Sequence, residues 1–180
     1  MTTPIFNFEK TINAALYVAE NIKERGFHKI FKILYFADRE HLAKYGRPIT
    51  GDTYIKMDYG PAPSNLYNIF KDIRGDGSFP VENLESYFSI IDEYIVNPEK
   101  KSDLSYLSRT DLNELNDSIL KYGEMPFEKL TEISHGIAWK LAPFNRKISI
   151  ENIMKEAGVG DEFIAHISGH MNLQKIMRGK

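Results

Sequence analysis

The sequence predicts an α+β fold, a mainly helical body with a small antiparallel β-sheet of two to three short strands. Three observations lead to this prediction. Most apolar residues recur at helical spacing in segments that end at glycine or proline. Two short segments instead have the alternation or the β-branched and aromatic composition of strands. No repeat, low-complexity tract or flexible linker divides the chain, so residues 1–180 are expected to form one domain.

Two helices are expected in the first quarter of the chain. From Phe8 to Arg25 the apolar residues follow helical spacing, and Gly26 is a natural stop. From His28 to Tyr45 apolar residues occupy nearly every side, which is typical of a buried central helix. Gly46 closes its charged last stretch, ADREHLAKYG.

The stretch RPITGDTYIKMDYGPAPSNLY, residues 47–67, predicts a strand followed by a helix. Alternation assigns one strand face to the core, that of Ile55, Met57 and Tyr59. It assigns the other face to solvent or a partner, that of Tyr54, Lys56 and Asp58. Pro61 has no N–H group, so the strand must end there or lie at an edge. Pro63 presets the first turn of a helix that passes Ile73 and ends at Gly75.

The rest of the chain predicts one more strand pair and several helices. Tyr87 to Val96 is expected to supply two short strands beside the first one, with a turn at Asp92-Glu93. Helices are expected at residues 110–121, 126–135, 150–156 and 162–177, with starts marked by Ser108, Pro126, Ser149 and Asp161. Residues 143–180 therefore form a C-terminal helical extension.

Composition favours an ordinary globular protein of the cytoplasm. The chain is 42% hydrophobic and 27% charged, and its net charge of −2 creates no global attraction for nucleic acid or an anionic membrane. The absence of cysteine excludes disulfides and thiol catalysis. The N-terminus lacks the pattern of a signal peptide, and charged residues interrupt every apolar run before it reaches membrane-spanning length.

The densest polar cluster is Asp38-Arg39-Glu40-His41. A carboxylate and a histidine three residues apart on a helix are typical of metal sites, but such sites need a second pair on a facing helix. We favour a helix end with internal salt bridges, with His41 near the negative end of the helix dipole. A metal-dependent hydrolase that uses Asp38, Glu40, His41 and His135 remains the alternative, and we expect no metal and no cofactor.

Other chemical motifs are weak. His166 and His170 lie four residues apart with Glu162 one turn earlier, and a surface pair is the favoured interpretation. Neither a Gly-x-Ser-x-Gly elbow nor a phosphate-binding loop occurs, so acyl transfer and phosphoryl transfer are unsupported. A DNA-binding regulator would depend on three basic C-terminal residues without an aromatic platform, namely Lys175, Arg178 and Lys180. We interpret them as a solvated tail.

The segment SHGIAWKLAP, residues 134–143, holds the only tryptophan. Trp139 lies four residues after His135, so the two side chains share one helical face and can form a recognition pocket. The favoured interpretation of Trp139 is a core anchor whose indole N–H bonds a carbonyl oxygen.

An ordered set of motifs resembles the Panacea domain, the family of SocA-like antitoxins and GepA-type phage-associated proteins. The set comprises LYFAD at residues 34–38, GDTY at 51–54, GPAP at 60–63, LS at 107–108 and HGIAW at 135–139. The likeness covers residues 13–143. It implies an antitoxin of a toxin–antitoxin system, linked to phage defence, that neutralises a toxin encoded nearby by direct protein–protein binding and without catalysis.

The resemblance leaves the toxin unnamed, because Panacea domains accompany many unrelated toxins. Self-association into a homo-oligomer also stays open. We expect the strand at 53–59 to present a rigid face to the toxin and its edge to be able to accept a toxin strand. The predicted partner-binding residues are Asp38, Tyr54, Lys56, Asp58, Tyr59, Pro61, Pro63, Tyr67, His135 and Trp139.

Overall fold

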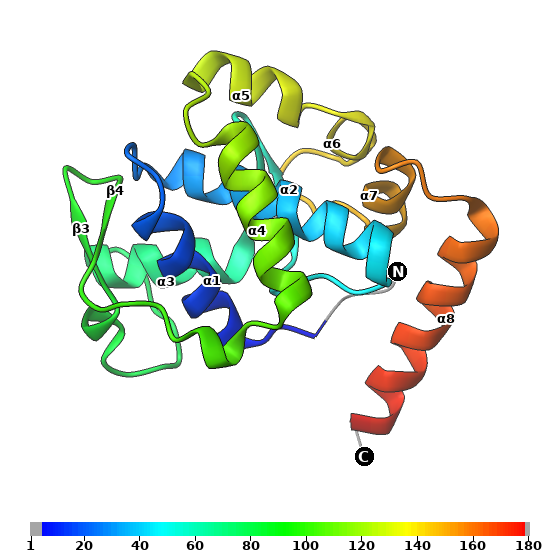
Figure 1. The fold of residues 1–180 in the computed structure, drawn as a ribbon, viewed down its shortest axis with the longest axis horizontal. Helices are drawn as coiled ribbons and strands as arrows, with labels where there is room; N and C mark the ends of the chain where they lie inside the picture. The colour runs from blue at the N-terminus through cyan, green and yellow to red at the C-terminus, as the bar shows by residue number, and fades with distance from the viewer. Residues whose placement is uncertain (1–4, 179–180) are drawn as a thin grey trace.

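The structure is a computed structural model that describes residues 5–178, without the side chains of residues 174, 175 and 178. One central helix lies at the middle of the fold. Helix α2 (Phe27–Tyr45) crosses the middle of the molecule (Figure 1), and its segment Ile33–Ala37 is at most 1% exposed. The predicted buried central helix is therefore confirmed. The basic residues Lys175, Arg178 and Lys180 lie outside the described side chains.

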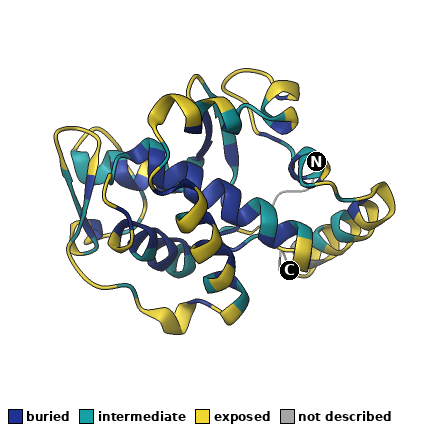
Figure 2. Cartoon of the chain, turned by 45° about the horizontal axis from the view of Figure 1, so that its top comes forward, coloured by how far each residue is buried: buried dark blue, intermediate teal, exposed yellow. Residues whose placement is uncertain are grey.

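Within residues 5–178 the other helices are α1 (Phe8–Glu20), α3 (Ser64–Arg74), α4 (Arg109–Tyr122), α5 (Phe127–Ser134), α6 (Ile137–Leu141), α7 (Ile150–Glu156) and α8 (Asp161–Arg178). Helices α1, α4, α5 and α7 pack against α2, α6 and α8 pack against α7, and burial in Figure 2 decreases outward from α2. Together with two separate pairs of antiparallel strands they confirm the α+β class. In the described part of the chain, no helix has the length and apolar character needed to cross a bilayer.

Strands β1 (Tyr54–Met57) and β2 (Gly60–Pro63) form an antiparallel hairpin in which two prolines are tolerated. Pro61 lies opposite Lys56, and Pro63 lies opposite Tyr54. The backbone groups of Lys56 and Tyr54 point away from β2, toward residues 145–148. Both prolines therefore fall at positions where the β1–β2 ladder needs no N–H group.

The outer edge of β1 is already occupied by residues 145–148. The Lys56 N–H donates to the Arg146 carbonyl oxygen (3.0 Å), and the Asn145 N–H donates to the Lys56 carbonyl oxygen (3.0 Å). The Ile148 N–H donates to the Tyr54 carbonyl oxygen (2.8 Å). The expectation that this edge could accept a strand from a toxin is therefore wrong, because a segment far along the same chain fills it.

The predicted faces of the first strand are also corrected. Tyr54, assigned to the partner face, is only 4% exposed, whereas Tyr59, assigned to the core, is 62% exposed. Strand alternation ends at Met57, because Asp58 and Tyr59 form the turn. The Tyr54 ring packs against Tyr35 of α2, so the buried face is the one toward the central helix.

The second hairpin, β3 (Phe88–Ile91) with β4 (Ile95–Pro98), turns at Asp92-Glu93 as predicted. It does not extend the first sheet, contrary to expectation. Its edge strand β4 instead bonds to residues 25–27 at the start of α2, through Val96 N–H to Arg25 O (2.9 Å) and Phe27 N–H to Tyr94 O (2.9 Å). The two hairpins thus pair with different segments of the chain.

Removal of residues 144–180 should abolish cooperative unfolding. This change uncovers the β1 edge and removes four buried side chains, Ile148, Ile150, Ile153 and Met154. Burial of each stabilises the fold by about 1.5–3 kcal/mol, a total comparable to the stability of a whole domain. Urea denaturation followed by circular dichroism measures the effect. A chain ending at Gly160 is the control and should unfold cooperatively; cooperative unfolding of residues 1–143 would contradict the prediction.

Candidate functional site

Asp38 ties the β1–β2 hairpin to the central helix from inside the protein. Its buried carboxylate accepts hydrogen bonds from Ile49 N (2.6 Å), Thr50 N (3.0 Å), Thr50 Oγ1 (2.6 Å) and Tyr54 Oη (2.8 Å). Burial raises the pKa of Asp38, and these hydrogen bonds oppose the rise. Four protein donors use the acceptor sites of the carboxylate, so it is not available to a partner or a metal.

Asp52 caps the helix that follows the hairpin. Helix α3 is preceded by Pro63, which offers no capping side chain. The Asp52 carboxylate caps the helix instead, although it lies well before the helix in the sequence. It accepts hydrogen bonds from Asn65 N (3.0 Å), Asn65 Nδ2 (2.9 Å) and Leu66 N (3.0 Å). The sequence pattern indicated only a turn at Gly51-Asp52, because a capping side chain thirteen residues before Asn65, the residue that it caps, leaves no local signal.

The remaining members of the Asp38–His41 cluster point in different directions. His41 is fully buried, with Nδ1 2.7 Å from the Arg47 carbonyl oxygen and Nε2 3.1 Å from Asp111 Oδ1. Glu40 pairs with Arg39 at 2.8 Å. Among the described residues, no three histidine, aspartate or glutamate side chains converge as metal ligands. The arrangement is that of the internal salt bridges favoured from the sequence.

Asp111 is the point where α1, α2 and α4 meet. This fully buried carboxylate lies 2.6 Å from Lys10 Nζ and 3.1 Å from Arg47 Nη1, in addition to His41. Burial alone would raise its pKa, but hydrogen bonds from His41, Lys10 and Ser108 lower the pKa of Asp111 well below its ordinary value. It also completes the capping box that Ser108 makes for α4.

His135 and Trp139 hold the turn of the hairpin. Their rings are parallel, with centroids 3.7 Å apart, and Lys56 Nζ lies 4.2 Å from the centroid of the Trp139 ring. Trp139 Nε1 donates to the Met57 carbonyl oxygen (3.0 Å), which matches the favoured interpretation of a core anchor. Lys56 Nζ donates to the Ala142 carbonyl oxygen (3.0 Å), so its ammonium is partly committed inside the molecule.

A buried lysine lies beneath the hairpin. Lys32 is 2% exposed, and its Nζ donates to the Pro61 carbonyl oxygen (2.8 Å). Among the described residues no carboxylate forms a salt bridge with Lys32, and burial lowers its pKa to about 7. Burial together with Lys32 lowers the pKa of His28 to about 4 and also lowers the pKa of His135. This region thus favours the neutral forms of three basic groups.

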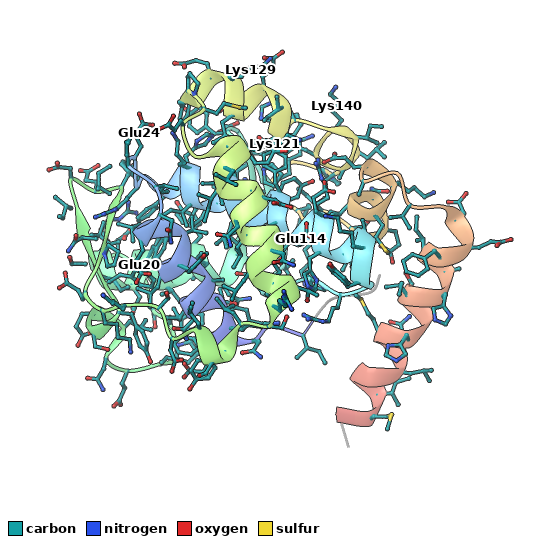
Figure 3. The ribbon with its side chains drawn as sticks, viewed as in Figure 1. Glu20, Glu24, Glu114, Lys121, Lys129 and Lys140 are labelled. Atoms are coloured by element: carbon teal, nitrogen blue, oxygen red, sulfur yellow. The ribbon has the colours of Figure 1, made fainter. Side chains whose placement is uncertain are left out.

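The solvent side of this region is rich in apolar groups. Tyr59 and Phe127 are 62% and 43% exposed, and their ring centroids are 5.3 Å apart. On α6, Ile137 and Leu141 lie one helical turn apart and are both exposed. Helices α5 and α6 lie next to one another, with Lys129 and Lys140 on their outer side (Figure 3). We define the docking face as Asp58 and Tyr59 of the hairpin turn together with Phe127 of α5.

The predicted partner-binding residues separate into three groups by burial. Four are buried and therefore cannot form an exposed contact face in this conformation: Asp38, Tyr54, Pro61 and Pro63. Four are partly buried: Lys56, Tyr67, His135 and Trp139. Two are exposed: Asp58 and Tyr59.

Sequence reasoning missed Phe127 of the docking face and also the exposed apolar pair Ile137 and Leu141 on α6. In the sequence, Ile137 and Leu141 lie at i and i+4 on either side of Trp139. That spacing was the available signal that α6 has a second apolar face.

Asp38→Ala should lower the free energy of unfolding by at least about 3 kcal/mol, because several buried donors lose their acceptor at once. Tyr54→Phe removes one donor and leaves the others satisfied, so it should cost only about 1 kcal/mol. Urea denaturation compares the two variants with the unchanged protein. Equal losses from both substitutions would contradict the role of Asp38 as the shared acceptor.

Stability should rise with pH above neutrality because of Lys32. The unfolded chain keeps a proton on this residue up to about pH 10.5, whereas the folded chain releases it near pH 7. Between these values the unfolded state holds more protons, so the free energy of unfolding should increase by about 1 kcal/mol per pH unit.

Lys32→Met should flatten this pH dependence, measured by urea denaturation between about pH 7.5 and 9.5. The exposed control Lys101→Met should keep the slope of the unchanged protein. An unchanged slope in Lys32→Met would show that other groups cause the dependence.

Of three comparisons with known proteins, one identifies a family. No curated protein and no solved structure matches the chain. A family model described as "Antitoxin SocA-like, Panacea domain" matches residues 30–140, a span that includes most of α2, the β1–β2 hairpin and the His135–Trp139 pair. This match covers more than half of the 180 residues, so the chain belongs to the SocA-like antitoxin family of Panacea domains.

Proposed function

We propose that this protein is an antitoxin that neutralises a toxin encoded beside it by binding that toxin directly, without catalysis. Membership of the SocA-like family supports the antitoxin role in general. The observation that carries the binding mechanism is the docking face, where the exposed Tyr59 of the hairpin turn packs against the exposed Phe127 of α5.

The rigidity of this hairpin tip favours tight binding. Trp139 holds the Met57 carbonyl oxygen directly before the turn, and Lys32 holds the Pro61 carbonyl oxygen directly after it. Side chains that are already ordered lose little conformational entropy when a partner covers them. Exposed aromatic residues in such positions are typical of interface residues that dominate binding energy.

The arrangement of the polar residues favours a binding protein over an enzyme. Asp38 and His41, which a metal-dependent hydrolase would use, are buried and hydrogen-bonded to separate protein groups. His135 stacks on Trp139 and faces the hairpin. A DNA-binding regulator would need a strong positive field, which a net charge of −2 does not provide.

Coexpression in bacteria with the adjacent reading frame tests the proposal. The adjacent frame should be toxic alone and harmless together with this protein. The double variant Tyr59→Ala with Phe127→Ala should lose the rescue and bind the purified toxin at least about tenfold more weakly, because two exposed aromatic contacts are removed. Leu120→Ala is the control, since Leu120 is 85% exposed on α4, outside the docking face. Isothermal titration calorimetry measures the affinities.

Two results would count against the proposal in different ways. Failure of the unchanged protein to rescue cells from a toxic neighbour would refute the antitoxin role. Full rescue by the Tyr59 and Phe127 double variant would keep that role and refute the docking face.

A further inference from the structure

A groove separates the C-terminal helix α8 from the body of the protein. It has a volume of about 470 Å³, within the range of about 300–1,000 Å³ that is usual for ligand sites. One wall is the α8 face with His166, Ile167, His170 and Met171. The opposite wall comes from the start of α1 and the loop at residues 45–51.

The position of α8 depends on the glycine that ends α2. Gly46 has a φ of +70°, and a Cβ atom added there would collide with the Ile167 side chain. Ile164, 6% exposed, anchors the first turns of α8. The helix therefore packs closely at one end and stands away from the body further along, as Figure 1 shows, which leaves the groove between them.

Basic groups line the groove. Lys10 and Arg47 lie on the body side, and His166 and His170 lie on α8. Among the residues whose side chains the structure describes, no aspartate or glutamate lines the groove. Lys10 and Arg47 share one buried carboxylate, Asp111, so two cations are balanced by a single negative charge. The Arg47 side chain remains 45% exposed.

Apolar side chains make up much of the remaining lining. Ile5 and Phe6 lie on the body side, opposite Ile167 and Met171 of α8. Nucleic acid would use the cations and leave this apolar surface unmatched, and the chain has a net charge of −2. A peptide with carboxylates beside an apolar side chain matches both parts of the lining.

We propose that this groove binds an acidic peptide segment of a protein partner, with carboxylates next to Arg47, Lys10 and the two α8 histidines and an apolar side chain between Phe6 and Met171. The site goes beyond the proposed toxin-binding role and is separate from the docking face. Its α8 wall lies outside residues 30–140, the part matched by the family model. It therefore provides recognition that the matched domain does not contain by itself.

Fluorescence anisotropy with the full chain and three fluorescein-labelled hexapeptides tests this site. The acidic and apolar probe is Glu-Phe-Glu-Asp-Leu-Glu. In the second peptide serine replaces phenylalanine and leucine, and in the third lysine replaces every acidic residue. A twelve-nucleotide single-stranded DNA is the fourth probe. We expect the first peptide to bind at least about tenfold more tightly than the other three probes.

A charge reversal on α8 provides the matched comparison. His166→Glu with His170→Glu should weaken binding of the first peptide at least about tenfold. Ala165→Glu with Asn172→Glu adds negative charge at two exposed positions outside the groove lining and should leave the affinity within about twofold. Circular dichroism confirms that both double variants keep their helix content.

Three outcomes would overturn the proposal. They are absence of binding by the acidic and apolar peptide, equal binding of the serine peptide or of the DNA, and equal weakening in the two double variants. None of these outcomes depends on toxin rescue, so the groove and the docking face are tested separately.

Discussion

The hydrogen bonds that converge on the buried carboxylate of Asp38 are the interaction on which the rest of this structure depends. A carboxylate removed from water is stable only when protein donors replace the lost solvent, so its four hydrogen bonds must form together. They come from the loop at residues 49–50 and from Tyr54, and the acceptor belongs to α2. Through these hydrogen bonds Asp38 fixes the position of β1 on the central helix, and the pairing of β2 with β1 then fixes the position of β2.

The β1–β2 hairpin has no free edge on β1 for another strand, whereas the residues of its turn are exposed. Residues 145–148 occupy one edge of β1, and β2 follows along the other edge with its two prolines. Lys32 and Trp139 fix the carbonyl groups on either side of the turn. Under the proposed function, a partner at this hairpin would contact side chains of the tip and would not pair with the main chain. The groove beside α8 differs from it in chemistry, since its basic side chains come from α1, the loop after α2 and α8, and none of them belongs to the hairpin.

Sequence patterns predicted the elements whose signals lie within one segment, but not the contacts between segments far apart in the sequence. Helices α2, α3 and α4 were predicted because apolar spacing and end signals such as Gly75 and Ser108 lie within each segment. The exposure of Tyr54 and Tyr59 was inverted, because alternation distinguishes two faces but does not say which one meets the central helix. The separate pairing of β3 with β4 and the groove depend on contacts between segments far apart in sequence, which leave no local pattern. Asp38 was predicted to bind a partner, but the structure shows it buried and bonded to four groups of the protein itself.

The hydrogen bonds between β1 and residues 145–148 also affect when the hairpin can fold during translation. Strand β1 lies between β2 and residues 145–148, and this second neighbour leaves the ribosome long after both strands of the hairpin. Until residues 135–148 emerge, the nascent chain carries an open strand edge beside a turn that lacks its His135 and Trp139 support. The hairpin therefore cannot reach its folded form when its own two strands are complete, and its assembly lags behind their synthesis.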